Sequence, residues 1–160
     1  MSLMAQDLPV PRKCQDPADF LSILHVDDES TFLAVSKIYL ERRGITVITA
    51  GSVREALRLL DTCCFDTILS DYQMPGINGI DFLKMLRERR CPIPFILFTG
   101  KLSEDVLAEA ISHGAMFSLP KGGDPRLRFA ELEQKIRIAS QRYRAGETGQ
   151  DMSPALPDAL

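Results

Sequence analysis

Acidic, hydroxyl and basic side chains follow short apolar runs of the sequence, each at the point where the run ends. Asp27 and Asp28 follow the first run, Asp71 follows a later one, and Thr99 and Lys121 follow the last two. Carboxylate oxygens are ligands that Mg²⁺ accepts, and Mg²⁺ keeps positions open for phosphate oxygens. A lysine ammonium and a hydroxyl can both donate hydrogen bonds to a phosphoryl group. These five residues define a candidate site for magnesium-dependent phosphoryl chemistry, provided that the fold brings them together.

Short β-branched runs alternate along the chain with amphipathic stretches, which is the pattern of successive strand and helix pairs. The first helix follows the first strand, and the spacing of Phe32, Val35 and Tyr39 places them on one of its faces. The five predicted strands are Ile23–Val26, Thr46–Ala50, Thr67–Ser70, Phe95–Phe98 and Met116–Leu119.

Capping residues mark the starts of three later helices. Ser52 and Glu55 have the spacing of a capping box, and Ser103 precedes another apolar helical period. Asp124 stands before Pro125, which suits the first position of a helix. These signals fix where the connections between strands and helices lie.

Five strand and helix pairs with short connections predict an α/β fold, a doubly wound five-stranded parallel sheet in the order 2-1-3-4-5 with helices on both faces. In that order strands one and three are neighbours where the strand order reverses, which is where such sheets bind ligands. Asp27, Asp28 and Asp71 are therefore expected to share a pocket, and Mg²⁺ would relieve their mutual repulsion. The alternative, for Asp28, Glu29 or Ser30 taken singly, is a helix cap.

The composition predicts a globular protein that acts on another protein. Hydrophobic residues make up 45% and charged residues 26%, and the net charge of −3 gives no general attraction to nucleic acid or anionic lipid. No apolar run is long enough to span a bilayer. We therefore expect a cytoplasmic protein that binds neither nucleic acid nor membrane. Its cysteines lack the spacing of a metal site and are expected to be reduced thiols: Cys14, Cys63, Cys64 and Cys91.

The chain divides into one domain and two flanking segments. Residues 1–20 contain three prolines and no helix or strand period, which is typical of a flexible arm. Residues 21–141 hold the strand and helix pairs and form the predicted domain. Residues 142–160 mix glycine and proline with acidic residues and are expected to be a flexible tail or linker.

The residues at the strand ends resemble the signature of the response-regulator receiver domain. The matching motifs are His25-Val26-Asp27-Asp28-Glu29, Ser70-Asp71-Tyr72-Gln73-Met74-Pro75 with Gly79 four residues later, Phe98-Thr99-Gly100, and Lys121. The resemblance covers about residues 21 to 140. It implies a flavodoxin-like receiver fold and a role in two-component signalling.

The resemblance also implies a role for each acidic position. Asp71 would be the phosphoacceptor, which receives its phosphoryl group from a histidine kinase or phosphotransfer protein. Asp28 and Asp71 would ligate Mg²⁺ directly, Asp27 mainly through water, and Gln73 through its backbone carbonyl. Such a domain catalyses only its own phosphorylation and dephosphorylation and is not otherwise an enzyme.

The remaining motif residues would contact the phosphoryl group. Lys121 would pair with it as a cation, Thr99 would donate a hydroxyl hydrogen bond, and Gly100 would leave room for it. Phosphorylation would then change a protein-binding surface around the fourth and fifth helices, which an unknown downstream protein reads and which could also form a homodimer.

Two features depart from the common receiver pattern. Receivers often carry an aromatic residue three positions before the lysine, where this chain has Ser118 beside Phe117. The proline that commonly follows the lysine is absent, because the sequence from Lys121 reads Lys-Gly-Gly-Asp-Pro. This variant resembles receivers of archaeal signalling proteins and predicts a freer loop after the fifth strand.

Two other functions compete with a phosphorylated receiver. One is a docking module that works without phosphorylation. The other is a phosphohydrolase that uses an aspartyl phosphate, but such enzymes need a second carboxylate two residues after the nucleophile, where this chain has Gln73.

Overall fold

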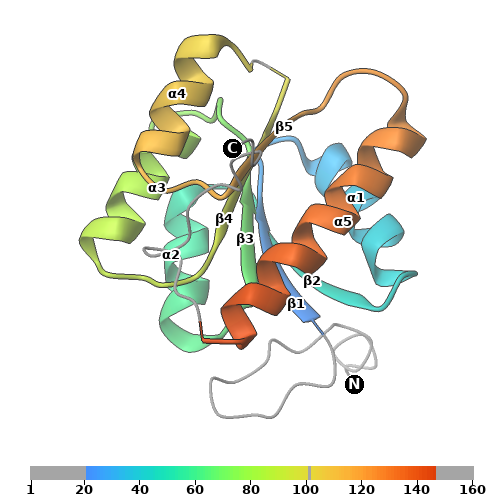
Figure 1. Ribbon diagram of the computed structural model, residues 1–160, viewed down its shortest axis with the longest axis horizontal. Coiled ribbons are helices and arrows are strands. Elements are labelled where there is room, and N and C mark those ends of the chain that lie inside the picture. The colour runs from blue at the N-terminus through green and yellow to red at the C-terminus, as the bar shows by residue number, and fades with distance from the viewer. Residues whose placement is uncertain (1–20, 101, 147–160) are drawn as a thin grey trace, which may run out of the picture.

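A five-stranded parallel sheet forms the centre of the computed structural model, which describes residues 21–100 and 102–146 (Figure 1). The elements in chain order are β1 (Leu21–Val26), α1 (Ser30–Glu41), β2 (Ile45–Ala50), α2 (Val53–Thr62), β3 (Thr67–Ser70), α3 (Gly79–Glu88), β4 (Phe95–Thr99), α4 (Glu104–Ser112), β5 (Phe117–Pro120) and α5 (Pro125–Arg144). The strand order is β2-β1-β3-β4-β5, and all pairs are parallel. The predicted fold class and strand order are confirmed.

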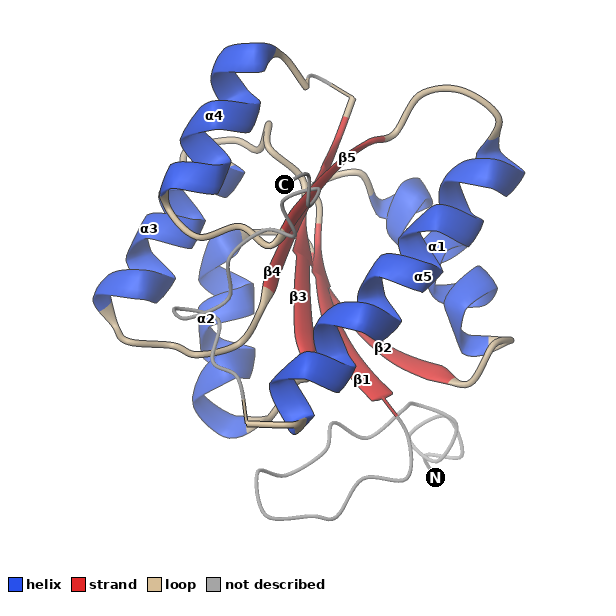
Figure 2. Cartoon of the chain, in the orientation of Figure 1, coloured by secondary structure: helices blue, strands red, loops and turns tan. Residues whose placement is uncertain are grey.

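Helices cover both faces of the sheet, with α1 and α5 on one side and α2, α3 and α4 on the other (Figure 2). Alternate residues of each strand point to opposite faces, so the strands supply two separate hydrophobic clusters. The cluster beneath α2, α3 and α4 contains Leu24, Ile68, Phe82, Leu83, Phe95 and Leu97, among others. The cluster beneath α1 and α5 contains Ile23, Leu69, Ile96, Phe98, Leu132 and Ile136, among others. Each such buried side chain contributes roughly 1.5–3 kcal/mol to folding.

Side-chain caps start four of the five helices, and all three predicted caps are present. Each capping oxygen accepts a backbone N–H from the first turn of α2, α3, α4 or α5, and the caps are Ser52, Asn78, Ser103 and Asp124. The capping box of α2 differs in one respect, because the Glu55 carboxylate accepts from the N–H of Gly51 and not from that of Ser52.

The predicted inward face of α1 is confirmed for Phe32 and Tyr39, which are half-buried against the cluster beneath α1 and α5, and is wrong for Val35. Leu33, Ser36 and Leu40 are its buried residues, whereas Val35 is 48% exposed. The pattern was misleading at Val35 because the inward face carries a polar residue, Ser36, whose hydroxyl hydrogen-bonds the ring of His25 at 3.0 Å.

The last helix extends beyond the predicted end of the domain. α5 continues to Arg144, three residues beyond the predicted domain end at 141. Arg144 forms two hydrogen bonds of 2.9 Å with the buried carboxylate of Asp66, which also accepts the N–H of Ser22. These contacts hold the end of α5 at the start of the sheet. The predicted arm and most of the predicted tail lie outside the described residues.

The expectation of four reduced thiols is wrong for Cys64. That residue is disulfide-bonded, whereas Cys63 and Cys91 are free thiols. Cys14 lies outside the described residues.

None of the helices within residues 21–100 and 102–146 combines the length and the apolar character that crossing a bilayer requires.

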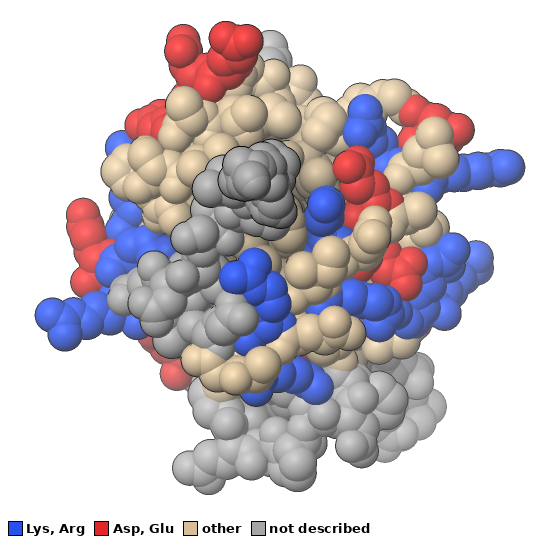
Figure 3. Space-filling model, in the orientation of Figure 1, with Lys and Arg blue, Asp and Glu red and all other residues tan. Residues whose placement is uncertain are grey.

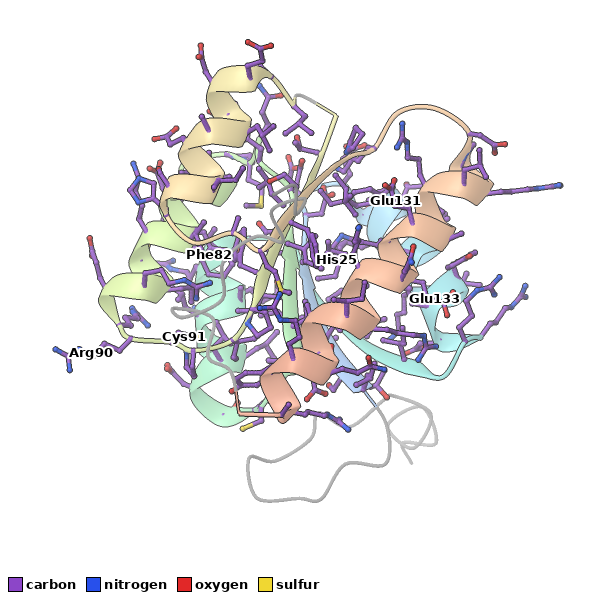
Figure 4. The ribbon with its side chains drawn as sticks, viewed as in Figure 1. His25, Phe82, Arg90, Cys91, Glu131 and Glu133 are labelled. Carbon is purple, nitrogen blue, oxygen red and sulfur yellow. The ribbon has the colours of Figure 1, made fainter. Side chains whose placement is uncertain are left out.

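His25 is a fully buried polar side chain of β1, and Figure 4 shows it inside the fold between the sheet and α5. Burial lowers its pKa to about 3, and the positive charge of Lys121 acts in the same direction. The imidazole is therefore neutral in the folded protein at ordinary pH.

We expect His25 to make the stability of the protein depend on pH in mildly acidic solution. Below pH 6.5 the unfolded chain binds a proton that the folded protein excludes, so the free energy of unfolding falls as pH drops toward 3, by up to about 1.4 kcal/mol per pH unit. Urea unfolding between about pH 6.5 and 5 should show a shallower decline for His25→Gln than for the wild type. His113→Gln, which changes the other histidine of the chain, is the matched control. Equal slopes for the wild type and His25→Gln would contradict this account.

Candidate functional site

The register of the sheet brings three carboxylates together. Val26 of β1 pairs with Ser70 of β3, so the next residues, Asp27 and Asp71, emerge side by side. The N–H of Asp71 donates to the carbonyl of Val26 at 2.9 Å, which fixes this offset. One carboxylate oxygen from each of Asp27, Asp28 and Asp71 lies within 4.8 Å of the others. The structure thus brings together the three aspartates that the sequence placed in one pocket.

The three aspartates differ in burial. Asp27 and Asp71 are buried and Asp28 is exposed, which leaves the cluster open to solvent on one side. The capping alternative does not account for Asp28, because the N-cap of α1 is Glu29 and no side chain makes a capping hydrogen bond there. Asp27 accepts the N–H of Glu29 at 2.9 Å.

Lys121 lies among the carboxylates. Its ammonium is 2.6 Å from an oxygen of Asp27, 3.4 Å from one of Asp71 and 3.8 Å from one of Glu29. The same ammonium lies 4.4 Å from the ring centroid of Phe32, so a cation–π contact helps to hold it. Asp27 is therefore the residue that positions Lys121 beside Asp71.

The charge balance of the cluster favours a cation. Burial raises the pKa of the Asp27 carboxyl, although the hydrogen bonds from Lys121 and from the N–H of Glu29 oppose this effect. When all groups are ionised, three carboxylates (−3) and one ammonium (+1) leave a net charge of −2. Carboxylate oxygens with an open side suit a hard divalent cation, so Asp27, Asp28 and Asp71 could hold one.

Thr99 and Lys121 meet at the carboxyl ends of β4 and β5. Thr99 pairs with Pro120, and the N–H of Lys121 donates to the carbonyl of Thr99 at 2.9 Å. Thr99 is buried. The adjacent Gly100 is open, since a Cβ there would meet nothing within 4 Å.

The loop between β3 and α3 forms the outer wall of the site. An open pocket is lined by Asp28, Glu29, Asp71, Tyr72, Gln73, Met74, Pro75 and Asn78. Gln73 follows Asp71 closely, so its position is compatible with the predicted carbonyl ligand. The N–H of Tyr72 donates to the carboxylate of Asp71 at 2.8 Å.

Gly79 closes this loop against the back of Asp71. Its N–H donates to the carbonyl of Tyr72 at 2.7 Å. A Cβ at Gly79 would overlap the backbone oxygen of Asp71 and lie 3.1 Å from Cδ1 of Leu97. Only glycine fits here, because the α3 backbone approaches β3 too closely for a side chain.

The structure places both residues that depart from the common receiver pattern, Ser118 in β5 and Gly122 in the loop after it. Phe117 packs with the cluster beneath α1 and α5, so it cannot occupy the opposite face to which Ser118 points. The hydroxyl of Ser118 is buried without a hydrogen-bond partner among the described residues. Arg128 donates from Nε to the carbonyl of Gly122, so the loop expected to be freer is tied to α5.

Three functional contacts were missed from the sequence. Phe32 was assigned to the helix face alone, but it also supports Lys121. Asn78 was not among the predicted caps, although a side-chain oxygen three residues before Asp81 is a cap signal, and this oxygen accepts the N–H of Asp81 at 2.8 Å. The backbone N–H of Tyr72 leaves no signal in the sequence.

We expect Gly79→Ala to disrupt the site through the backbone of Asp71. Because neither the β3 end nor α3 can move freely, the overlap should cost about 3 kcal/mol or more in the free energy of unfolding. Urea unfolding measures this loss. Gly122→Ala is the matched control, since a Cβ at that position meets nothing within 4 Å. A Gly79→Ala protein as stable as the Gly122→Ala protein would show that the loop adapts.

The chain is similar to known response regulators. The family described as response regulator receiver domain matches residues 23–136. The response regulator SaeR of Staphylococcus aureus (strain USA300) is 35% identical over 118 residues, which cover 72% of this chain and 48% of SaeR. The chain thus spans about half the length of the curated relatives that it matches.

Solved receiver structures share the fold. A receiver domain protein from Clostridium thermocellum is 31% identical, with a TM-score of 0.71, and the match covers 79% of this chain and 98% of that one. The receiver domain of the Francisella response regulator 1452 is 28% identical, with a TM-score of 0.71, and covers 77% and 98%. The chain belongs to the response regulator receiver domain family, as the acidic cluster at the ends of β1 and β3 indicates.

Proposed function

We propose that this receiver domain accepts a phosphoryl group on Asp71 in a magnesium-dependent reaction and thereby switches a protein-interaction surface. The observation that carries the proposal is the juxtaposition of Asp71 with two further carboxylates and with the ammonium of Lys121. The phosphoryl donor is a histidine kinase or a phosphotransfer protein, as the family membership supports.

The residues that would hold Mg²⁺ are Asp27, Asp28, Asp71 and the backbone carbonyl of Gln73. Their fit rests on the donor set, which is all oxygen, carries a net negative charge and is open on the side of Asp28. When bound, Mg²⁺ offsets charge on the transferring phosphoryl oxygens.

Asp71 supplies the nucleophile. One carboxylate oxygen accepts the N–H of Tyr72, which leaves the other, 3.4 Å from Lys121, to attack phosphorus. The new bond joins this oxygen to phosphorus, while the bond from phosphorus to the imidazole nitrogen of the donor breaks and the electron pair stays on that nitrogen. The product is an acyl phosphate on Asp71.

Lys121 and Thr99 respond to the new phosphoryl group. Lys121 exchanges part of its contact with the carboxylates for a charge-assisted hydrogen bond to a phosphoryl oxygen. Thr99 donates its hydroxyl from the end of the adjacent strand. Because the N–H of Lys121 is bound to the carbonyl of Thr99, movement of either residue reaches both β4 and β5.

The surface of α4, β5 and α5 is the proposed output. Acidic side chains gather at the start of α4, and Lys and Arg side chains follow α5 among a few acidic ones (Figure 3). Leu107 and Ile111 of α4 and Leu127 of α5 are exposed apolar side chains. Such a surface suits a downstream protein or a second copy of the chain.

The proposed setting is the cytoplasm, where kinase and receiver meet. The domain acts as a phosphoacceptor and catalyses only its own phosphorylation and dephosphorylation. Phosphorylation shifts an existing equilibrium between two conformations of the output surface.

We expect the wild-type protein to gain the mass of one phosphoryl group when it is incubated with Mg²⁺ and acetyl phosphate. Intact-mass spectrometry should show no gain for Asp71→Asn, because an amide is not a nucleophile here, and none without Mg²⁺. Asp61→Asn, on the exposed surface of α2, is the matched control and should gain the same mass as the wild type.

Two results would contradict the proposal, and each would favour one of the two alternative functions. No gain from acetyl phosphate or from a phosphorylated histidine donor would favour a docking module. Sustained release of phosphate from an external ester would favour a phosphohydrolase.

We also expect Mg²⁺ alone to stabilise the folded protein. A ligand that binds only the folded state at a hundredfold excess over its Kd adds about 2.7 kcal/mol, and the relief of repulsion among the aspartates is the physical cause here. Thermal unfolding should show a Tm increase that Asp28→Asn largely removes. Asp105→Asn, at the start of α4, should retain the increase. A wild-type Tm that does not change when Mg²⁺ is added would contradict the proposed metal site.

A further inference from the structure

The ammonium of Lys121 has two kinds of partner. It lies 2.6 Å from an oxygen of Asp27 and 3.4 Å from one of Asp71, and it also lies 4.4 Å from the ring centroid of Phe32. The face of an aromatic ring attracts a cation at distances up to about 6 Å, and more strongly where water is excluded. The Lys121 side chain is 14% exposed, so both kinds of contact act in a partly dehydrated place.

The ring of Phe32 is fixed by other rings. Phe32 lies in the first turn of α1, and its ring packs against three rings that come from three other elements. Its centroid is 5.8 Å from that of His25 in β1 (labelled in Figure 4), 5.6 Å from that of Phe98 in β4 and 5.9 Å from that of Phe129 in α5. Aromatic pairs at such separations attract each other. Because a lysine side chain is long and flexible, the fixed ring positions the ammonium and not the reverse.

The two kinds of contact respond differently to a divalent cation at the aspartates. Asp27 and Asp71 attract Lys121 through their negative charge, and a bound cation would cancel much of that charge and repel the ammonium. The ring of Phe32 is uncharged, and its attraction for a cation comes from the quadrupole of the ring. The cation–π contact therefore persists when the carboxylate contacts are weakened.

Glu29 offers the ammonium a competing position. Its carboxylate lies 3.8 Å from the Lys121 ammonium, and its side chain is 67% exposed. A pocket of about 330 Å³ is lined by Glu29, Phe32 and Lys121, among others, so the ammonium has room to move. Without the ring, a cation at the aspartates would favour a turn of Lys121 toward Glu29 and solvent.

We propose that Phe32 is a positioning residue for phosphoryl transfer to Asp71. Its ring keeps the ammonium of Lys121 beside Asp71 while the carboxylates hold a cation, so that the ammonium is in place when the phosphoryl oxygens arrive. The inference rests on the proposed function and adds to it a residue that touches neither the metal nor the phosphoryl group.

Proton NMR of the metal-free protein tests the contact itself. Protons above a ring face resonate upfield, so the ε-methylene protons of Lys121, assigned by their loss in Lys121→Met, should lie upfield of those of Lys84, whose partner is a carboxylate. Phe32→Leu should abolish this shift and Tyr39→Leu should retain it. Tyr39 is the matched control, because it lies in the same helix and cluster but has its cation–π contact with Arg43, at 4.1 Å. The absence of an upfield shift in the wild type would refute the proposal.

The rate of phosphorylation tests the positioning role. The gain of mass from acetyl phosphate is followed over time at saturating Mg²⁺. We expect Phe32→Leu to react about three- to tenfold more slowly than the wild type, which is the factor that a partly dehydrated cation–π contact represents. Pentafluorophenylalanine at position 32 should slow the reaction at least as much, because fluorination reverses the charge of the ring face and keeps the shape of the ring. Tyr39→Leu should react at the wild-type rate.

The outcomes separate this inference from the proposed function. Equal rates for the wild type and both Phe32 variants would overturn the positioning role and leave the proposed function intact. A slow Phe32→Leu protein with a wild-type rate for the fluorinated protein would show that the ring acts by packing alone, which also contradicts the proposal. A smaller Mg²⁺-dependent rise in Tm for both Phe32 variants would assign their slower rates to metal binding, against the proposal. No phosphorylation of the wild type would overturn the proposed function and this inference with it.

Discussion

Repulsion among the three aspartates at the ends of β1 and β3 is the constraint on which the site depends. Parallel pairing of these strands places Asp27 and Asp71 next to each other, and the sheet cannot relieve their repulsion without a change of register. Lys121 neutralises only part of the charge, although it lies 2.6 Å from Asp27. The site thus stores unfavourable electrostatic energy that a bound cation or a covalent change at Asp71 can alter. A change in this electrostatic energy can shift the equilibrium between two conformations of the domain.

The rest of the fold stabilises this arrangement. Two hydrophobic clusters sandwich the sheet, and the close approach at Gly79 fixes the β3–α3 loop behind Asp71. The ammonium of Lys121 contacts the ring face of Phe32, and a hydrogen bond from Arg128 to the carbonyl of Gly122 joins the loop after Lys121 to α5. The fold therefore fixes the backbone that carries the carboxylates, and side-chain contacts position the ammonium of Lys121 among them.

The sequence predicted the strand order and the cluster because both follow from strong local signals. Apolar runs located the strands, and topology then determined which strand ends meet. The burial of Ser36 in α1 was not predictable in the same way, since its hydroxyl has a partner, His25, from another element. The disulfide state of Cys64 depends likewise on a contact that spacing does not encode. Local patterns indicate which apolar residues of an element face the hydrophobic core. They do not indicate which polar residues of two different elements will contact each other.

The two ends of the sheet have different physical roles. At the carboxyl ends of the strands, charges are crowded and partly uncompensated, so small chemical changes there have large electrostatic effects. At the opposite end, the bidentate pair between Arg144 and the buried Asp66 joins α5 to the start of β1. Loss of Arg144 would leave the buried carboxylate of Asp66 without its charged partner, whereas Arg144 itself is partly exposed to solvent. With α5 anchored at that end, we expect a displacement of Lys121 at the other end to affect β5, its loop and the first turns of α5. The expected route does not require an aromatic residue at Ser118, since Lys121 is linked to Thr99, and Gly122 to Arg128, through their backbone groups.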